Sequence, residues 1–141
     1  MFKNLLLAVD GSEHSRRATE KALELAGLSE GSSIEILYVV PGSKSKSDVL
    51  HYGDSDSASM KRKRMLKEFE EMIQSKNIPV ETTMLHGKDG SAEAIIEHAN
   101  NGAYDALILG SRGLSTVQTM VLGSVSHKVI KYVKAPVLMV K

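Results

Sequence analysis

Three glycines and a serine near the end of the chain have a spacing suited to binding phosphate. Gly110-Ser-Arg-Gly113 is followed, after nine intervening residues, by Gly123-Ser124. The apolar run at 106–109 before this segment is typical of a buried strand, and a helical stretch begins at Ser124. At such a junction, unpaired main-chain N–H groups and the positive end of the helix dipole both favour an anion. We therefore interpret the segment as a phosphate site.

Within this segment, the main chain and the side chains would make different contacts. Gly110 and Gly113 have no Cβ, so the backbone there could approach a polyphosphate closely. Arg112 lies between them and could add a positive charge. The start of the helix would offer amide groups and two hydroxyls, from Gly123, Ser124, Val125 and Ser126. A plainer reading stays open, in which the glycines shape a surface turn and Ser124 is an ordinary N-cap.

A carboxylate and two valines end other predicted strands. Val9 and Asp10 close the first apolar segment, and Val39 lies at the end of the second. Ligands of open parallel sheets bind beyond the carboxyl ends of the strands. Asp10 would suit a ribose hydroxyl or a divalent metal ion, and the valines could line a slot for a purine. Asp10 also has a plainer reading as a helix cap, because Asp10 and Glu13 have the spacing of a capping box.

Five strand-like segments alternate with four helical ones. The predicted strands are 5–9, 33–40, 80–86, 104–109 and 136–140. The predicted helices run from about residue 13 to Gly27 or Gly31, and over about 58–75, 91–99 and 124–133. This alternation predicts an α/β fold with an open parallel sheet and helices on both faces. The pattern alone does not give the strand order.

Length and composition exclude several classes of protein. The chain has 141 residues, which we interpret as one domain over 1–141 with a flexible polar loop at about 42–57. A net charge of +1 gives no reason to expect a nucleic-acid partner. No cysteine is present, so disulfides and thiol catalysis are excluded. The apolar stretch at 5–9 is too short for a signal sequence or a membrane span, so we expect a cytoplasmic protein without membrane attachment.

Other signatures of nucleotide binding and catalysis are missing from the sequence. Neither the P-loop pattern nor the dinucleotide-binding G-x-G-x-x-G after the first strand occurs. The five histidines show no metal-binding spacing. Ser124-x-Ser126-His127 lacks the strand-to-helix elbow of a nucleophilic serine.

Three parts of the sequence together resemble the universal stress protein family, over essentially the whole chain. They are the G-2x-G-9x-G-[ST] arrangement, the strand ending in Val9-Asp10-Gly-Ser12, and the final Pro136-Val-Leu-Met-Val140. The glycine arrangement resembles the ATP-binding branch of that family. The resemblance implies a Rossmann-like, adenine nucleotide α-hydrolase-like sheet of order 3-2-1-4-5, and a homodimer formed through 136–140. The ATP contacts that it implies are Val9, Asp10, Val39, Gly110, Arg112, Gly113, Gly123, Ser124, Val125 and Ser126. Members of the family vary at the position of Arg112.

The leading hypothesis is therefore a regulatory stress-response module that binds ATP, with Mg²⁺ held at Asp10. Only one carboxylate and one arginine lie near the expected phosphates, so we expect slow or no hydrolysis and assign no catalytic residue. A nucleotide-free dimeric scaffold is the alternative. An enzyme that cleaves between the α- and β-phosphates is a weaker one, because Asp10-Gly-Ser12 lacks the character of an adenylation loop. The sequence does not identify the stress, the downstream partners, or the ligand beyond an adenine nucleotide.

Overall fold

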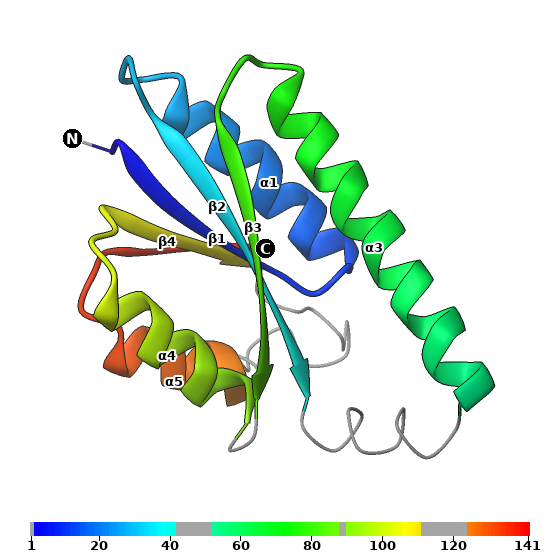
Figure 1. Ribbon diagram of the computed structural model, residues 1–141. Coiled ribbons are helices and arrows are strands. Elements are labelled where there is room, and N and C mark those ends of the chain that lie inside the picture. Colours follow the sequence, from blue (N-terminus) through cyan, green and yellow to red (C-terminus); the bar gives the residue numbers. More distant parts are fainter. Residues whose placement is uncertain (1, 42–51, 88–89, 111–123) are drawn as a thin grey trace.

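The computed structural model describes residues 2–41, 52–87, 90–110 and 124–141, and strands and helices alternate through these ranges (Figure 1). The elements are β1 (Asn4–Val9), α1 (Glu13–Ala26), β2 (Ser33–Pro41), α3 (Tyr52–Gln74), β3 (Val80–Gly87), α4 (Ser91–Asn101), β4 (Ala106–Gly110), α5 (Ser124–Tyr132) and β5 (Val137–Val140). Among the helices of these ranges, none is long and apolar enough to cross a membrane.

All strands are parallel, and the sheet has the order β3-β2-β1-β4-β5. The central strand is β1, in which Leu7 lies opposite Ile36 on one side and Ile108 on the other. The predicted open five-stranded parallel sheet of order 3-2-1-4-5 is therefore confirmed. From β1 the chain adds β2 and β3 on one side of the sheet, and then crosses to add β4 and β5 on the other side. The carboxyl ends of β1 and β4 therefore flank the crevice where such folds bind ligands.

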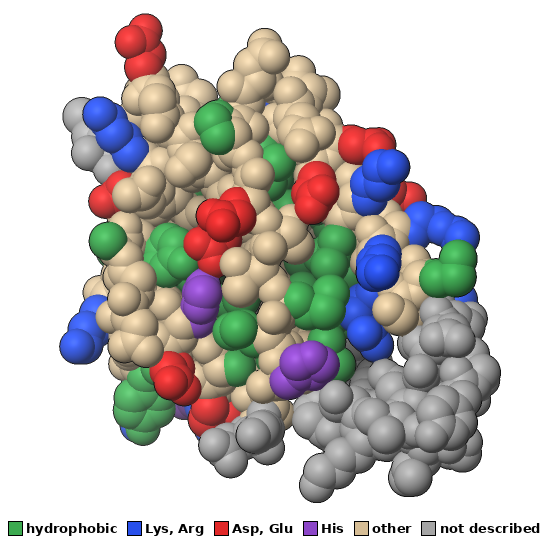
Figure 2. All heavy atoms as spheres, viewed as in Figure 1, with side chains coloured by type: hydrophobic (Ala, Val, Ile, Leu, Met, Phe, Trp, Pro, Cys, Tyr) green, Lys and Arg blue, Asp and Glu red, His purple; other side chains and the backbone are tan. Residues whose placement is uncertain are grey.

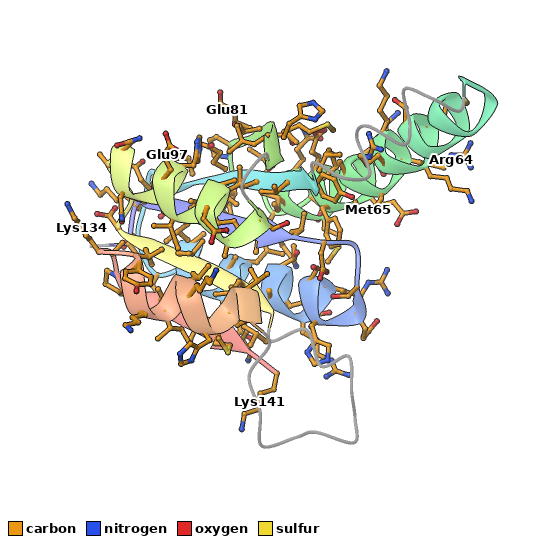
Figure 3. The ribbon with its side chains drawn as sticks, turned by 90° about the horizontal axis from the view of Figure 1, so that it is seen from below. Arg64, Met65, Glu81, Glu97, Lys134 and Lys141 are labelled. Carbon is orange, nitrogen blue, oxygen red and sulfur yellow. The ribbon has the colours of Figure 1, made fainter. Side chains whose placement is uncertain are left out.

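Helices cover both faces of the sheet, with α1 and α3 on one face and α4 and α5 on the other (Figures 1 and 3). Alternate side chains of β1 point to opposite faces. Leu5, Leu7 and Val9 belong to the core cluster that includes α1 and α3. Leu6 and Ala8 belong to the cluster that includes α4 and α5. Burial on both faces explains why β1 is apolar without interruption rather than alternating.

The long helix α3 extends past the sheet and carries most of the basic side chains on the face seen in Figure 2. Arg64 is exposed and points away from the sheet, whereas Met65 points back toward α1 (Figure 3). Leu66 and Phe69 are buried in the core on the same side as α1. The exposed lysines and arginines therefore lie on a solvent-facing side of an amphipathic helix.

The beginnings of two helices differ from the sequence-based expectation. Helix α3 begins at Tyr52, so residues 52–57, which we expected in the polar loop, are helical, while 42–51 lie outside the described residues. Helix α1 is capped by Ser12, whose Oγ accepts a hydrogen bond from the Ser15 N–H at 3.2 Å. The expected Asp10–Glu13 capping box is therefore wrong.

Candidate functional site

Six of the ten residues that the sequence analysis selected line one pocket of about 90 Å³ at the carboxyl ends of the strands. They come from β1, β2, β4, α5 and the turn after β1, and are Val9, Asp10, Val39, Gly110, Val125 and Ser126. Ser124 is the first residue of α5. Arg112, Gly113 and Gly123 lie outside the described residues.

The inner wall of this pocket is mainly apolar. Ala8, Leu37 and Leu109 contribute from three neighbouring strands, and Ile95 contributes from α4. Ser91, the first residue of α4, also lines the pocket. Ser91 and Ile95 were not predicted from the sequence, although α4 follows the carboxyl end of β3 and must begin at the same edge of the sheet. An apolar pocket with a few polar groups at its edge is typical of small-molecule sites.

Asp10 is exposed at the edge of the pocket, and its carboxylate is held by the first turn of α1. Its Oδ1 accepts hydrogen bonds from the Ser12 N–H at 2.9 Å and from the Ser15 Oγ at 2.6 Å. The main-chain N–H of Asp10 donates to the same Ser15 Oγ at 2.8 Å. Gly11 permits this turn because its φ of 86° lies in the left-handed region.

Gly110 lies against α1, and this packing leaves no room for a side chain. A Cβ at Gly110 would come within 2.7 Å of the main-chain carbonyl carbon of His14 and within 2.8 Å of its oxygen. Backbone atoms of a helix cannot move aside as the end of a flexible side chain can. The absence of a side chain at Gly110 thus has a structural reason that the sequence analysis did not foresee.

Ser126 carries a buried hydroxyl without a partner. Its exposed fraction is 1%, and its Oγ has no hydrogen-bond partner among the described residues. Buried hydroxyls in proteins are nearly always hydrogen-bonded, and an exception calls for an explanation such as a missing ligand. The position of Ser126 in the wall of the pocket points to a ligand or water as that partner.

An ion pair joins the two helices that begin beside the pocket. The Lys128 Nζ of α5 lies 2.8 Å from the Glu93 Oε1 of α4. The hydrogen bond from Lys128 lowers the pKa of the Glu93 carboxyl below its ordinary value. Both side chains are well exposed to solvent, so this pair contributes little to stability by itself.

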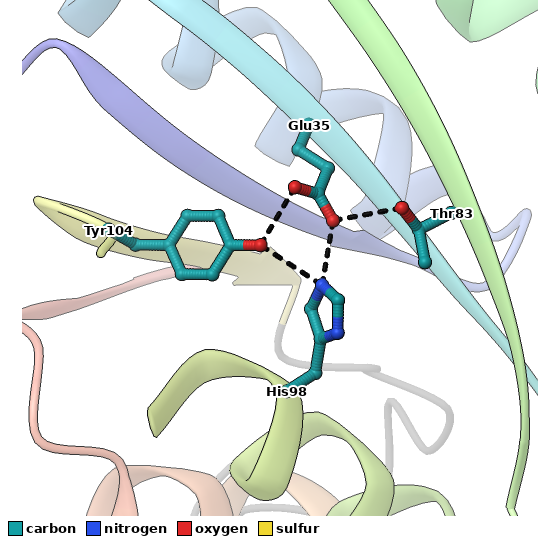
Figure 4. A network of polar contacts seen from close by, with 4 residues as sticks. All are labelled: Glu35, Thr83, His98 and Tyr104. Carbon is teal, nitrogen blue, oxygen red and sulfur yellow. Dashed lines mark hydrogen bonds and ion pairs between the residues drawn. The ribbon is translucent and has the colours of Figure 1, made fainter. Parts of the chain in front are cut away.

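A second polar cluster, which was not predicted from the sequence, lies away from the pocket (Figure 4). The Glu35 Oε1 accepts a hydrogen bond from the Tyr104 hydroxyl at 2.7 Å. The Glu35 Oε2 accepts one from the Thr83 hydroxyl at 2.9 Å and lies 2.7 Å from the His98 Nε2. Burial by itself raises the pKa of Glu35, but the hydrogen bonds from Tyr104, His98 and Thr83 outweigh it and lower the pKa. Burial and the bond to Glu35 raise the pKa of Tyr104.

This cluster connects β2, β3, α4 and the segment between α4 and β4. Glu35 is the third residue of β2, whereas Val39 at the pocket comes four residues later, toward the carboxyl end. We therefore interpret the cluster as a structural one that holds α4 on the sheet.

A larger groove lies elsewhere and has the wrong charge for phosphate. It has a volume of about 680 Å³ and lies between the end of α1 and the connection from α3 to β3. Glu20, Glu24 and Glu30 line it, with Lys76 as the only basic residue among its lining residues. None of the residues selected from the sequence belongs to it. Three carboxylates and the carbonyl end of a helix disfavour an anion.

No group of three or more His, Cys, Asp or Glu side chains in the described ranges is arranged to hold a metal ion. Among the described residues that line the pocket, Asp10 is the only one with a carboxylate. Mg²⁺ is commonly bound through one or two carboxylates together with phosphate oxygens and water. The site therefore fits Mg²⁺ only as a companion of a phosphate ligand.

Three similar structures contain adenine nucleotides. A universal stress protein from Archaeoglobus fulgidus in complex with dAMP has a TM-score of 0.73 at 22% identity, covering 100% of this chain and 98% of that one. A universal stress protein in complex with cAMP has a TM-score of 0.71 at 23% identity, covering 99% of this chain and 96% of that one. A universal stress protein family protein from Arabidopsis thaliana with AMP bound has a TM-score of 0.68 at 21% identity, covering 99% of this chain and 91% of that one. At these identities they show a common fold.

Comparison of the whole sequence gives the family. The model of the universal stress protein family matches residues 1–141. The chain is 32% identical, over 151 aligned residues and the full length of both chains, to universal stress protein YxiE of Bacillus subtilis. The structure of universal stress protein UspA from Lactobacillus plantarum superposes with a TM-score of 0.82 at 20% identity, covering 99% of this chain and 98% of that one. The chain belongs to the universal stress protein family.

Proposed function

We propose that this protein binds an adenine nucleotide, ATP foremost, in the pocket at the carboxyl ends of β1 and β4, and acts as a nucleotide-dependent regulatory module. The observation that carries the proposal is the unpartnered, buried hydroxyl of Ser126 in the wall of a pocket that six of the selected residues line. The nucleotide complexes of the similar structures support adenine as the common chemical feature.

Each part of the nucleotide has a matching region of the site. The base would lie against the apolar wall that includes Val9 and Val39. The ribose would face Asp10 at the edge, and the phosphates would extend toward Ser126 and the glycine segment that begins at Gly110. ATP, rather than a monophosphate, is proposed because that glycine segment has the spacing of the ATP-binding branch.

Mg²⁺ belongs to the proposal as a companion of the triphosphate. As an alternative to its contact with the ribose, Asp10 would hold the ion, which would supply neutralisation of the phosphate charge. Removal of Mg²⁺ by a chelator should weaken ATP binding but leave adenosine binding unchanged. Equal affinity for ATP with and without Mg²⁺ would remove the ion from the proposal.

We propose slow or absent hydrolysis for a reason of side-chain chemistry. Among the lining residues that the structure describes, the polar side chains are those of Asp10, Ser91 and Ser126. One carboxylate and two hydroxyls provide no second acid–base group to orient a water molecule for in-line attack. Single-turnover hydrolysis at about 1 s⁻¹ or faster, a kinase-like rate, would contradict this.

We also propose the homodimer through the last strand. In the described sheet β5 is an edge strand, paired only with β4. Three of the six exposed large hydrophobic side chains of the described residues lie on α5 and β5, namely Ile130, Tyr132 and Leu138. Sedimentation should show a dimer that Leu138→Lys converts to a monomer, and a monomeric wild type would refute this part.

We propose a cytoplasmic location and no nucleic-acid partner as well.

Isothermal titration with ATP and Mg²⁺ tests the central proposal. Wild type should bind one nucleotide per chain, and Gly113→Val should not, because its side chain would occupy the path of the phosphates. Gly27→Ala serves as a control, since a Cβ there would make only ordinary contacts at 3.5 Å. No binding to wild type at millimolar ATP would favour the nucleotide-free scaffold. Detection of AMP and pyrophosphate would favour the α-hydrolase-like enzyme.

A further inference from the structure

We infer that Ser15, which the sequence analysis did not select, is a positioning residue of the nucleotide site. Its hydroxyl holds the Asp10 carboxylate in the orientation that receives the ribose hydroxyls. This inference rests on the function proposed above. It attributes an expected preference for ribose over deoxyribose to Ser15 and Asp10 together.

The hydroxyl of Ser15 contacts Asp10 twice. It accepts a hydrogen bond from the Asp10 N–H at 2.8 Å and donates one to the Asp10 Oδ1 at 2.6 Å. One group thus bridges the main chain and the carboxylate of a single residue. This closed arrangement limits rotation of the Asp10 side chain, and the Ser12 N–H on the same oxygen limits it further.

Ser15 itself is held more firmly than the residue that it contacts. Its exposed fraction is 2%, whereas Asp10 is exposed. The Ser15 N–H donates to the Ser12 Oγ at 3.2 Å, and the Ser15 carbonyl accepts from the Thr19 hydroxyl at 2.8 Å. The first turn of α1 therefore provides a rigid support, and Asp10 is the oriented group.

The orientation has a consequence for ligand chemistry. A carboxylate has about four acceptor positions, and with Oδ1 accepting from Ser12 and Ser15 its orientation determines which hydroxyls of a ligand can donate to it. Ribose presents two vicinal hydroxyls and deoxyribose lacks one of them. If the Asp10 side chain were free to rotate, binding would have to order it, which weakens affinity. Ser15→Ala should therefore weaken ATP binding about three- to tenfold, and weaken the binding of 2′-deoxy-ATP or 3′-deoxy-ATP by a smaller factor, because each keeps only one of the two hydroxyls.

A purely structural role of Ser15 would give a different result. Loss of the hydroxyl would then lower stability and weaken all nucleotides by the same factor. The ratio of the Kd for the deoxynucleotides to the Kd for ATP separates the two roles, because it cancels a uniform effect. Ser15→Thr retains the hydroxyl and should retain the ratio.

The experiment is isothermal titration of the full chain with ATP, 2′-deoxy-ATP and 3′-deoxy-ATP, with urea denaturation of each variant. Ser32→Ala is the matched control, because Ser32 is also buried and hydrogen-bonded, to the carbonyls of Phe2 and Ser29. We expect the wild type, Ser32→Ala and Ser15→Thr to prefer ATP to the same extent, and Ser15→Ala to prefer it less. If Ser15→Ala does not fold, Ser15→Cys takes its place, since a thiol is a poor donor and this variant should show the same reduced preference.

The outcomes distinguish this inference from the proposed function. A wild type that binds none of the three nucleotides overturns the proposed function and this inference with it. A wild type that binds ATP without any preference for ribose overturns the role of Asp10 alone. If the wild type prefers ATP to the deoxynucleotides, and Ser15→Ala and Ser15→Cys both keep that preference, the role of Ser15 is wrong while the proposed function stands.

Discussion

Replacing Ser126 by alanine should stabilise the ligand-free protein and weaken nucleotide binding at the same time. The hydroxyl is buried and has no partner among the described residues, so the folded protein bears the cost of removing it from water. A bound nucleotide would supply the missing partner. The two opposite effects follow from one geometric observation.

The magnitudes follow from the state of the hydroxyl. A buried polar group without a partner costs about 1–3 kcal/mol, so Ser126→Ala should raise the free energy of unfolding by about 1 kcal/mol or more. Up to about 0.5 kcal/mol of that gain would come from the higher helix propensity of alanine. A hydrogen bond to a charged group contributes about 1.5–3 kcal/mol, so loss of a bond to phosphate should raise the Kd about tenfold or more.

Urea denaturation with and without ATP, together with isothermal titration, measures both effects. Ser32→Ala is the control, because Ser32 is buried but hydrogen-bonded, and its replacement should destabilise the protein. Opposite signs for the two serine variants in ligand-free urea titrations are the expected result. A destabilised Ser126→Ala variant, or one with unchanged ATP affinity, would refute the assignment of Ser126 to the ligand.

Two further predictions concern packing and pH. Gly110→Ala should lower the free energy of unfolding by about 1–3 kcal/mol, because its Cβ would overlap the backbone of His14. Wild-type stability of this variant in urea denaturation would contradict the close packing of Gly110 on α1. Since the pKa of Glu35 is lowered in the folded state, its ionised form stabilises the protein above its ordinary pKa of about 4.5, and this contribution is lost as the pH falls through the folded value. Tyr104→Phe, which removes one of the donors to Glu35, should therefore destabilise more at pH 7 than at pH 3. An equal loss at both values would argue against the ionised state of Glu35.

The sheet could be predicted well because local physics determines it. Uninterrupted apolar runs such as 5–9 and 106–109 are explained by burial on both faces, and the alternation with helices requires parallel strands. The strand order came from the family resemblance, since periodicity contains no information on which strands are neighbours. The order is confirmed, as is the family.

The details around Asp10 could not be predicted in the same way. Asp10 and Ser12 are both good cap residues, and the choice between them depends on the left-handed turn at Gly11. Ser15 did carry a signal, because it lies on the buried face of α1 with Ala18 and Ala22, where a polar side chain needs a partner.

The Glu35 cluster gave no such signal. Its members are separated by up to 69 residues in sequence, as for Glu35 and Tyr104, and only the folded sheet brings them together. The structural role of Gly110 also depended on a distant contact, since His14 belongs to another element. Interactions of this kind are determined by packing, and the sequence pattern of a single element does not contain them.

A crystal structure grown with excess ATP and Mg²⁺ would show directly whether this pocket is a nucleotide site. We expect the base against the apolar wall beside Val9 and Val39, the ribose at Asp10, and a phosphate oxygen within hydrogen-bond distance of the Ser126 hydroxyl. An empty pocket at saturating nucleotide, or ATP bound in another part of the molecule, would contradict it.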